Sequence, residues 1–243
     1  MPSSSHRPRK RFGQHFLHER GVVEKIIAAI APQHHDFIVE IGPGEGVLTR
    51  PLVSSGAKVE VIELDRDLAS RLEPEVTVHC ADALEFDFAR FPPGTRVVGN
   101  LPYNISTPLL FHLAGSAERV RDMHFMLQLE VVERMVAAPS TPAYGRLSVA
   151  LQARFRMKKL FSVSRGAFRP APKVESAVVR LEPREDPLQI DEDLLRRAFS
   201  ARRKTLRNAL PDADFAAAGV DPRLRPENLT PEDYARLSIP LFR

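Results

Sequence analysis

A glycine-rich turn between an apolar strand and a helix constrains this chain more than any other feature of its sequence. Residues 37–41 form a short apolar run, and a turn with glycine at positions 42, 44 and 46 follows it directly. Residues 47–55 then have the pattern of a helix. Glycines at such a turn allow positive φ angles and close approach of the backbone to a ligand. The spacing is G-x-G-x-G, which differs from the G-x-G-x-x-G of dinucleotide-binding enzymes.

Further apolar runs with strand character follow the turn, and the segments between them are long enough for crossover helices. These runs cover residues 59–64, 76–80, 96–99 and 123–129. Residues 21–31 precede the first strand and have the periodicity of a helix. Strands that alternate with helical connections predict an α/β fold, in which a parallel, Rossmann-like sheet carries helices on both faces.

The character of the chain changes in its last third. Residues 146–163 form a basic amphipathic segment, residues 174–181 read as another strand, and prolines cluster over residues 183–187. From Asp191 the pattern is purely helical, with apolar positions on one face. We therefore predict three parts: a flexible basic arm over residues 1–11, a catalytic domain over residues 12–185, and a small all-α C-terminal domain over residues 186–243.

The charge of the chain is mild in total and strongly segregated along the sequence. The 243 residues carry a formal net charge of +4. Residues 144–173 contain eight Lys or Arg and no acidic residue, and residues 196–207 contain six and none; residues 1–20 are basic as well. Such segregation favours a surface for a polyanion, most simply nucleic acid, over a merely solvated face.

Cysteine content and hydropathy restrict the remaining classes. The single cysteine, Cys80, excludes an intrachain disulfide framework and a cysteine-based zinc site, and it suits the reducing cytoplasm. The longest strictly apolar run has six residues, Ile26 to Ala31, which is too short to span a membrane. The histidines show no metal-binding spacing, so we expect no metal.

Two acidic residues at the ends of the second and third strands strengthen the prediction of a ligand site at the glycine turn. Glu63 ends the second strand, where a carboxylate can accept both ribose hydroxyls of an adenosine-containing cofactor. Asp82 lies just past the third strand, at a position that suits an adenine amino group. Each acid alone is more often a surface or helix-capping residue. Together with Gly42 and Gly44, at the carboxyl ends of successive strands, they favour such a cofactor.

A tetrapeptide after the fourth strand suggests chemistry on an amino group. In Asn100-Leu101-Pro102-Tyr103, the Asn100 side-chain oxygen and a backbone carbonyl such as that of Leu101 can accept both hydrogens of an exocyclic amine. This would aim the nitrogen lone pair at a methyl donor. Pro102 fixes the turn and lacks an N–H, and the Tyr103 ring could stack on a base removed from its helix. Phe168 is predicted to stack from the other side.

These stretches, in this order, resemble the bacterial small-subunit ribosomal RNA adenine dimethyltransferase family over nearly the whole chain. The resemblance is carried by residues 9–17, 39–49, 100–106, 127–131, 168–176 and 202–208. It implies S-adenosylmethionine as methyl donor. It also implies dimethylation of two adjacent adenosines in the 3′-terminal hairpin loop of 16S rRNA, within an immature small subunit. Separately, we expect the enzyme to be a monomer.

The resemblance also implies roles for single residues. Family positions that bind the cofactor correspond to His15, Leu17, Gly42, Glu63, Asp82 and Asn100, where many bacterial members have Asn in place of His15. For RNA binding we select basic residues of the three windows: Arg9, Lys10, Arg11, Arg154, Lys158, Arg202, Arg203 and Lys204.

Two alternatives remain open from the sequence. One is a 23S rRNA adenine dimethylase of the macrolide-resistance type, which residues 11–14, 42–44 and 202–208 disfavour. The other is a non-catalytic ribosome assembly factor that keeps the basic surface, which the intact Glu63, Asp82 and Asn100 disfavour.

Overall fold

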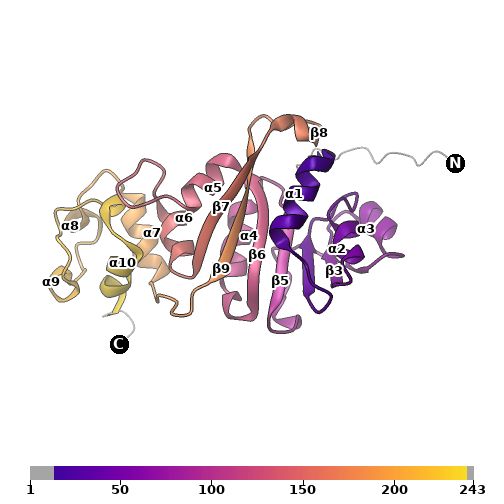
Figure 1. The fold of residues 1–243 in the computed structure, drawn as a ribbon. Coiled ribbons are helices and arrows are strands. Elements are labelled where there is room, and N and C mark those ends of the chain that lie inside the picture. Colours follow the sequence, from indigo (N-terminus) through magenta and orange to yellow (C-terminus); the bar gives the residue numbers. More distant parts are fainter. Residues whose placement is uncertain (1–13, 240–243) are drawn as a thin grey trace. The chain divides into compact units, whose positions relative to one another are not determined.

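The computed structural model describes residues 14–239 (Figure 1). The predicted basic arm over residues 1–11 lies outside the described residues. The chain divides into two compact units, which we call the sheet unit and the helical unit. The sheet unit contains the residues up to Val132 together with Lys158–Glu182, and the helical unit contains Glu133–Met157 together with the residues from Pro183 onward.

The sheet unit is built around a seven-stranded sheet with the order β4-β3-β2-β5-β6-β9-β7. Five neighbouring strands, from β4 to β6, are parallel, whereas β9 runs antiparallel to β6. The strands are β2 (Phe37–Ile41), β3 (Lys58–Ile62), β4 (Thr77–His79), β5 (Thr95–Asn100), β6 (Val120–Gln128), β7 (Phe155–Val163) and β9 (Ser176–Pro183). The α/β class is confirmed, but the sheet is mixed rather than wholly parallel.

Helices connect the parallel strands as predicted, except between β4 and β5, where a 3-10 turn takes the place of a crossover helix. The helices are α1 (Arg20–Ile30), α2 (Thr49–Ser54), α3 (Arg66–Leu72), α4 (Ser106–Ala114) and α5 (Leu129–Met135), with 3-10 turns at Phe88–Arg90, Ala117–Arg119 and Arg165–Ala167. A separate two-stranded ribbon pairs β1 (Phe16–Leu17) with β8 (Phe168–Arg169). The ribbon joins the start of the described chain to a segment about 150 residues away in sequence, which no local pattern could indicate.

The burial of the central strands explains why the sequence signal was clear there. All residues of β2 after Phe37 are buried, because a parallel strand in the middle of such a sheet is covered on both faces. The apolar run over residues 37–41 therefore predicted β2 at its observed bounds. The segment 146–163 behaves differently, since it forms a short helix, α6 (Arg146–Gln152), and then β7. Pairing next to β9 decides the strand, and the amphipathic pattern alone did not separate the two elements.

The helical unit has its own core and begins earlier than predicted. Besides α6 it contains α7 (Glu192–Ser200), α8 (Leu206–Ala209), α9 (Phe215–Ala218) and α10 (Pro231–Ser238), with a 3-10 turn at Pro226–Asn228. Tyr144 and Tyr234 are fully buried in this core and donate hydrogen bonds to the carbonyls of Leu229 and Pro226, at 2.8 and 2.9 Å. Residues 133–157, which the prediction placed in the catalytic domain, belong here because the Tyr144 segment packs among these helices.

A buried arginine joins the amino-terminal ends of three parallel strands. Arg96 on β5 is 4 % exposed, and its guanidinium donates to Asp36 before β2, at 2.9 Å, and to Asp122 on β6, at 2.8 and 2.9 Å. It also donates to the carbonyl of Ile30 at the end of α1, at 2.6 Å. Both carboxylates are buried as well, and each has one further, half-exposed partner: Arg121 lies 2.9 Å from Asp36, and Arg180 lies 3.6 Å from Asp122. Arg96 is the buried cation that compensates both charges.

We expect Arg96→Met to lose roughly 3–5 kcal/mol of unfolding free energy, because Asp36 and Asp122 would lose their buried partner and keep only the half-exposed Arg121 and Arg180. The measurement is equilibrium unfolding in urea. The control is Arg20→Ala, which removes an exposed ion pair with Glu24 on α1 and should change stability by less than about 1 kcal/mol. A similarly small loss for Arg96→Met would contradict the role given to the cluster.

Candidate active site

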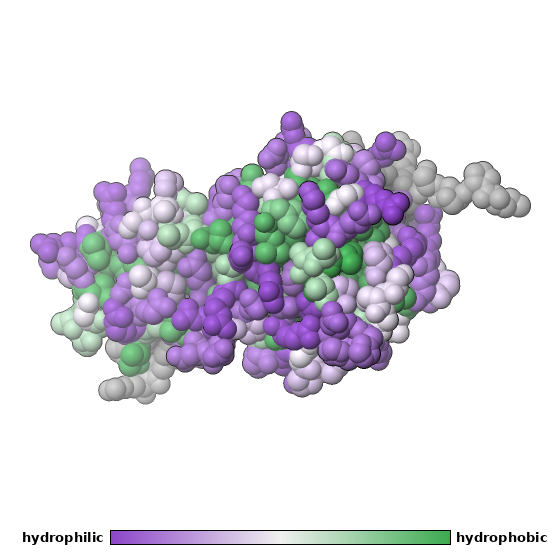
Figure 2. Space-filling model, in the orientation of Figure 1, coloured by the Kyte–Doolittle hydropathy of each residue, from purple (hydrophilic) through white to green (hydrophobic). Residues whose placement is uncertain are grey.

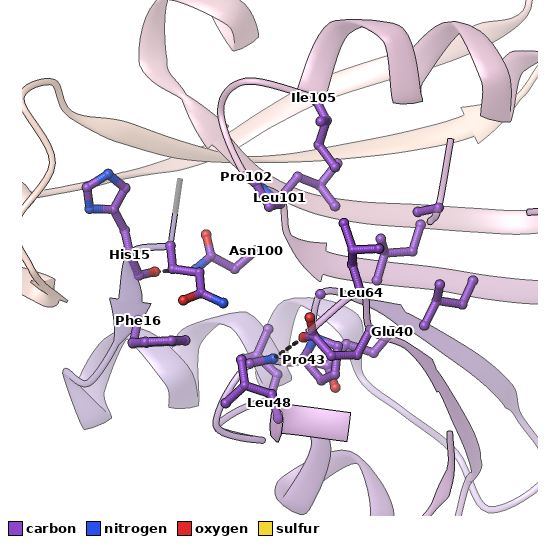
Figure 3. Close-up of a pocket in the computed structure, with 18 of the residues that line it drawn as sticks. His15, Phe16, Glu40, Pro43, Leu48, Leu64, Asn100, Leu101, Pro102 and Ile105 are labelled. Atoms are coloured by element: carbon purple, nitrogen blue, oxygen red, sulfur yellow. Dashed lines mark hydrogen bonds between the residues drawn. The ribbon is translucent and has the colours of Figure 1, made fainter. Parts of the chain in front are cut away.

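A cavity of about 360 Å³ lies at the carboxyl ends of β2, β3, β4 and β5, entirely within the sheet unit (Figure 3). Its wall comes from the loops that follow these strands and from the segment at the start of the described chain. The lining residues are 14–17, 40–45, 47–48, 62–64, 68, 81–83 and 100–105. Open parallel sheets bind ligands at this edge, and all seven predicted cofactor positions lie on the wall.

The glycine turn brings backbone N–H groups to the cavity. Gly44 has φ +59°, a conformation that L side chains rarely adopt, and a Cβ added there would lie 3.1 Å from the ring of Phe16. Its N–H donates to a Glu63 carboxylate oxygen at 3.2 Å. The turn is therefore held against the end of β3, and a side chain at position 44 would disturb both the turn and the wall beside it.

Glu63 is the acidic residue that the prediction assigned to the cofactor ribose. Its side chain is 7 % exposed, and its second carboxylate oxygen accepts from the N–H of Asp65 at 2.9 Å. Burial raises the pKa of Glu63 above its ordinary value, although the hydrogen bonds from Asp65 and Gly44 oppose this. The backbone thus orients the carboxylate in the wall.

Asp82 completes the predicted acidic pair. Its carboxylate accepts from the N–H of Leu84 at 2.9 Å, which fixes the side chain at the turn after β4. Asp82 lines the cavity between Ala81 and Ala83, two small residues that leave space beside it. Two oriented carboxylates, from the loops after β3 and β4, fit the hydroxyl and amino donors of an adenosine group.

Glu40 is a site residue that the sequence analysis missed. It lies on β2, lines the cavity and is 1 % exposed. The Thr49 hydroxyl donates to its carboxylate at 2.6 Å. Burial raises the pKa of Glu40 to about 7, with a smaller contribution from the nearby charge of Glu63. An acidic residue inside the otherwise apolar run 37–41 was the signal that could have identified it.

Asn100 ends β5 and faces the first residues of the described chain. Its side-chain NH₂ group donates to the backbone carbonyl of His15 at 3.0 Å (Figure 3). Because the NH₂ group is used in this way, the side-chain oxygen is the atom left to accept a hydrogen from a ligand. The bond also gives His15 a role through its backbone, which does not depend on its side chain.

The residues after Asn100 form a tight turn into α4. Leu101 is buried, and its N–H donates to the carbonyl of Met126 on β6 at 3.2 Å. The carbonyl of Pro102 accepts from the N–H of Ile105 and the hydroxyl of Ser106, at 3.2 and 2.9 Å. All the residues from Asn100 to Ile105 line the cavity, so the structure brings the predicted reacting group together with the cofactor positions.

Phe168 does not take the predicted place opposite Tyr103. Its ring is 3 % exposed, belongs to the hydrophobic core of the sheet unit and is absent from the cavity wall. The reason is the pairing of β8 with β1, which places Phe168 opposite the buried Leu17. We therefore correct the prediction: Phe168 is a core residue in this structure, and the aromatic residues of the wall are His15, Phe16 and Tyr103.

The predicted RNA-binding residues fall in both units. Lys158 is exposed on β7 in the sheet unit, whereas Arg154, Arg202, Arg203 and Lys204 belong to the helical unit. Helix α7 ends at Ser200, so Arg202 to Lys204 lie in a turn before α8, although the purely helical pattern from Asp191 predicted a helix there.

Arg202 differs from its neighbours in this turn. It donates to Glu227, at 3.1 Å, and to the carbonyl of Pro142, at 3.0 Å, so much of its charge serves the helical unit itself. Arg203 and Lys204 are exposed. Figure 2 shows that the visible face is largely hydrophilic, with hydrophobic residues gathered in patches. Arg9, Lys10 and Arg11 lie outside the described residues.

The family comparison agrees with the motifs. The family model described as ribosomal RNA adenine dimethylase matches residues 5–241. The chain belongs to the ribosomal RNA adenine dimethylase family. It is therefore an rRNA adenine dimethyltransferase with the Rossmann-like fold of S-adenosylmethionine-dependent methyltransferases.

Individual relatives are similar over almost their whole length. The chain is 57 % identical over 250 residues to the ribosomal RNA small subunit methyltransferase A of Aromatoleum aromaticum, covering 97 % of this chain and 94 % of that protein. Among solved structures, a dimethyladenosine transferase from Plasmodium falciparum has a TM-score of 0.80 at 28 % identity, covering 94 % and 98 % of the two chains. The 23S rRNA methyltransferase ErmE has a TM-score of 0.70 at 27 % identity, covering 94 % and 100 %.

Two further observations concern only the described part of the chain. No helix between residues 14 and 239 is both long and apolar enough to cross a membrane. Within the same residues, no group of three or more His, Cys, Asp or Glu side chains is arranged to hold a metal ion.

The raised pKa of Glu40 predicts how stability depends on pH. The folded-state pKa of Glu40, about 7, exceeds the ordinary value of 4.5. The contribution of Glu40 to the free energy of unfolding is therefore fully present below the ordinary value and is lost as the pH rises through 7. We expect Glu40→Gln to be more stable than the wild type at about pH 8.5, by up to roughly 3 kcal/mol, and similar to it at about pH 5. Urea unfolding without added cofactor measures this difference.

The control for this prediction is Glu24→Gln, which changes an exposed carboxylate on α1. Its difference from the wild type should be small and the same at both pH values. A Glu40→Gln protein that differs from the wild type equally at both pH values would show that Glu40 does not carry the pH dependence.

Proposed function

We propose that this enzyme transfers methyl groups from S-adenosylmethionine to the exocyclic nitrogens of two adjacent adenosines in the 3′-terminal hairpin loop of 16S rRNA. The substrate is the immature small ribosomal subunit, and each adenosine receives two methyl groups. The observation that carries the proposal is the Asn100 side chain, whose NH₂ group is held by His15 so that its oxygen is available at the cavity.

The residues of the cavity fit an adenosine-containing sulfonium cofactor. Glu63 and Asp82 would hold its ribose hydroxyls and adenine amino group, and the turn with Gly42 and Gly44 permits close approach of the backbone. Leu17 and Leu101 supply apolar wall. When bound, the cofactor supplies a methyl group on a good leaving group, which needs no metal for the transfer.

The chain's own residues orient the target amine. The nitrogen of adenine N6 is a poor nucleophile because its lone pair is conjugated with the ring. The Asn100 oxygen and a backbone carbonyl such as that of Leu101 accept its two hydrogens, which favours a pyramidal nitrogen with a directed lone pair. Tyr103 offers its ring to stack on a base that has been removed from its helix. Alignment and fixed acceptors supply most of the rate gain.

The basic windows supply affinity for the RNA backbone. Lys158 on β7 and the exposed Arg203 and Lys204 of the helical unit are suited to phosphate contacts, which position a nucleic acid without reading its sequence. We further propose that Arg9, Lys10, Arg11 and Arg154 also contact RNA phosphates, and that the enzyme acts as a monomer in the cytoplasm.

Sequence similarity favours the small-subunit substrate over the alternatives. The fold resembles both a dimethyladenosine transferase and a 23S rRNA methyltransferase, so the fold alone does not select the substrate. Sequence identity separates the two: it is 57 % to a small-subunit methyltransferase and 27 % to ErmE, which favours the small-subunit substrate. A purely non-catalytic assembly factor is disfavoured, because Glu63, Asp82 and Asn100 all lie on one cavity.

The test uses small subunits from a strain that lacks these methyl groups, incubated with the enzyme and labelled S-adenosylmethionine. Nuclease digestion and mass spectrometry should find dimethyladenosine at the adjacent pair in the 3′-terminal hairpin. Label in naked 23S rRNA, and none in the hairpin, would favour the resistance-type enzyme. Cofactor binding without transfer to either RNA would favour an assembly factor.

Replacing Asn100 with alanine should reduce turnover about 10²-fold or more, because one preorganised acceptor is lost. Single-turnover methylation of subunits at saturating cofactor measures the effect. The control is Asn228→Ala, which removes a side-chain amide that bonds to Ser140 in the helical unit and should leave turnover nearly unchanged. A loss of less than about tenfold for Asn100→Ala would count against its role.

The double variant Arg203→Ala, Lys204→Ala should bind small subunits more weakly and with a shallower salt dependence. Each lost phosphate contact makes the negative slope of log K against log salt less steep by roughly 0.7–0.9. Binding measured over a series of KCl concentrations gives the slope. Arg223→Ala, an exposed arginine of the same unit outside the basic windows, serves as the control. An unchanged slope in the double variant would remove this turn from the RNA surface.

A further inference from the structure

The ring of Tyr103 is held at two points by residues that lie outside the Asn100–Tyr103 motif. Its hydroxyl is 2.6 Å from the Ser176 hydroxyl, at the start of β9. Its ring stacks on the His15 imidazole, with centroids 5.5 Å apart and an angle of 30° between the planes. All three residues belong to the sheet unit, so their arrangement is internal to one compact part of the molecule.

Ser176 is well placed to fix the hydroxyl end of the ring. It is fully buried, and β9 pairs it with Gln128 at the end of β6. The N–H of Leu129 donates to the carbonyl of Glu175 at 2.9 Å, which extends the same pairing by one more bond. A serine hydroxyl on such a strand has little freedom to move. Its hydrogen bond to Tyr103 therefore fixes the hydroxyl end of the ring relative to the sheet.

His15 fixes the face of the ring, and it is itself fixed. Its Nδ1–H donates to the carbonyl of Pro170 at 2.8 Å, which sets the direction of the imidazole. Its own carbonyl accepts from the Asn100 side chain. His15 therefore contacts both ends of the motif, Asn100 through its backbone and Tyr103 through its ring.

We infer that Ser176 and His15 are positioning residues that hold the Tyr103 ring in the orientation required to stack on the target adenine. Pro170 and Ser176 lie in the segment 168–176, so this segment acts on the base through Tyr103 and not through the buried Phe168. The inference rests on the proposed function, in which Tyr103 stacks on the adenine. A ring held at two points restricts the base to fewer orientations, and better alignment raises turnover.

The composition of the chain allows a direct test of the ring's surroundings. The protein has three tyrosines, and the other two, Tyr144 and Tyr234, are buried in the helical unit. Tyrosine labelled with ¹³C at Cζ therefore gives three resonances, and Tyr103→Phe assigns one of them. We expect Ser176→Ala and His15→Asn each to shift the Tyr103 resonance and to leave the Tyr144 and Tyr234 resonances in place.

Ser148→Ala is the matched control for the spectrum. Ser148 is also fully buried, and its hydroxyl donates to a backbone carbonyl, that of Arg134, in the helical unit. Its removal should leave the Tyr103 resonance unchanged. If Ser176→Ala does not fold, Ser176→Cys keeps the shape of the side chain with a weaker hydrogen-bonding group, and it should shift the same resonance.

Kinetics test whether Ser176 acts through the Tyr103 hydroxyl. We expect Ser176→Ala to lower kcat by about 3- to 10-fold, with little change in the KM for the cofactor. In a Tyr103→Phe background, the same substitution should change kcat by less than about twofold, because the shared bond is already absent. Additive losses, or a Tyr103 resonance that does not move in Ser176→Ala and His15→Asn, would overturn the inference.

The two readouts separate this inference from the proposed function. If the wild type methylates no RNA, the proposed function fails, and the ¹³C spectra still report whether Ser176 and His15 hold the ring. If methylation occurs and the Tyr103 resonance stays in place in both variants, the proposed function stands and the positioning role is wrong.

Discussion

The buried guanidinium of Arg96 is the interaction on which the arrangement of the sheet unit depends. It joins Asp36 before β2, Asp122 on β6 and the end of α1 from its own position on β5. Because these strands are parallel, the cluster lies at their amino-terminal ends and the cavity lies beyond their carboxyl ends. Fixing one end of neighbouring strands also fixes their register, and hence the relative heights at which β2 and β5 present Glu40 and Asn100.

The active site combines rigid strand ends with residues brought from distant parts of the chain. Gly44 is held by Glu63, and Asn100 is held by His15. Tyr103 receives its contacts from His15 and Ser176, which are 88 and 73 positions away in the sequence. Each of these three residues is thus oriented by a second contact, so little reorganisation is needed when a substrate arrives.

Sequence patterns predicted the parts of this structure that depend on local or repeated signals. The central strand over residues 37–41, the glycine turn, and the acidic residues after β3 and β4 were all recognisable. Patterns failed where pairing decides the outcome. Residues 146–163 divide into α6 and β7, and residues 196–207 divide at Ser200. Glu40 was missed because a single charge inside an apolar strand reads as an irregularity until its burial is known.

The sequence by itself determined the α/β class and the family, and it predicted the candidate cofactor positions and the motif at Asn100, because strand periodicity and ordered motifs are properties of the chain. The tertiary structure alone decided that β9 is antiparallel, that Phe168 is a core residue, and that His15 and Ser176 hold Tyr103. These features depend on contacts between segments far apart in the chain. Their free energy comes from burial and pairing in three dimensions, which no local pattern records.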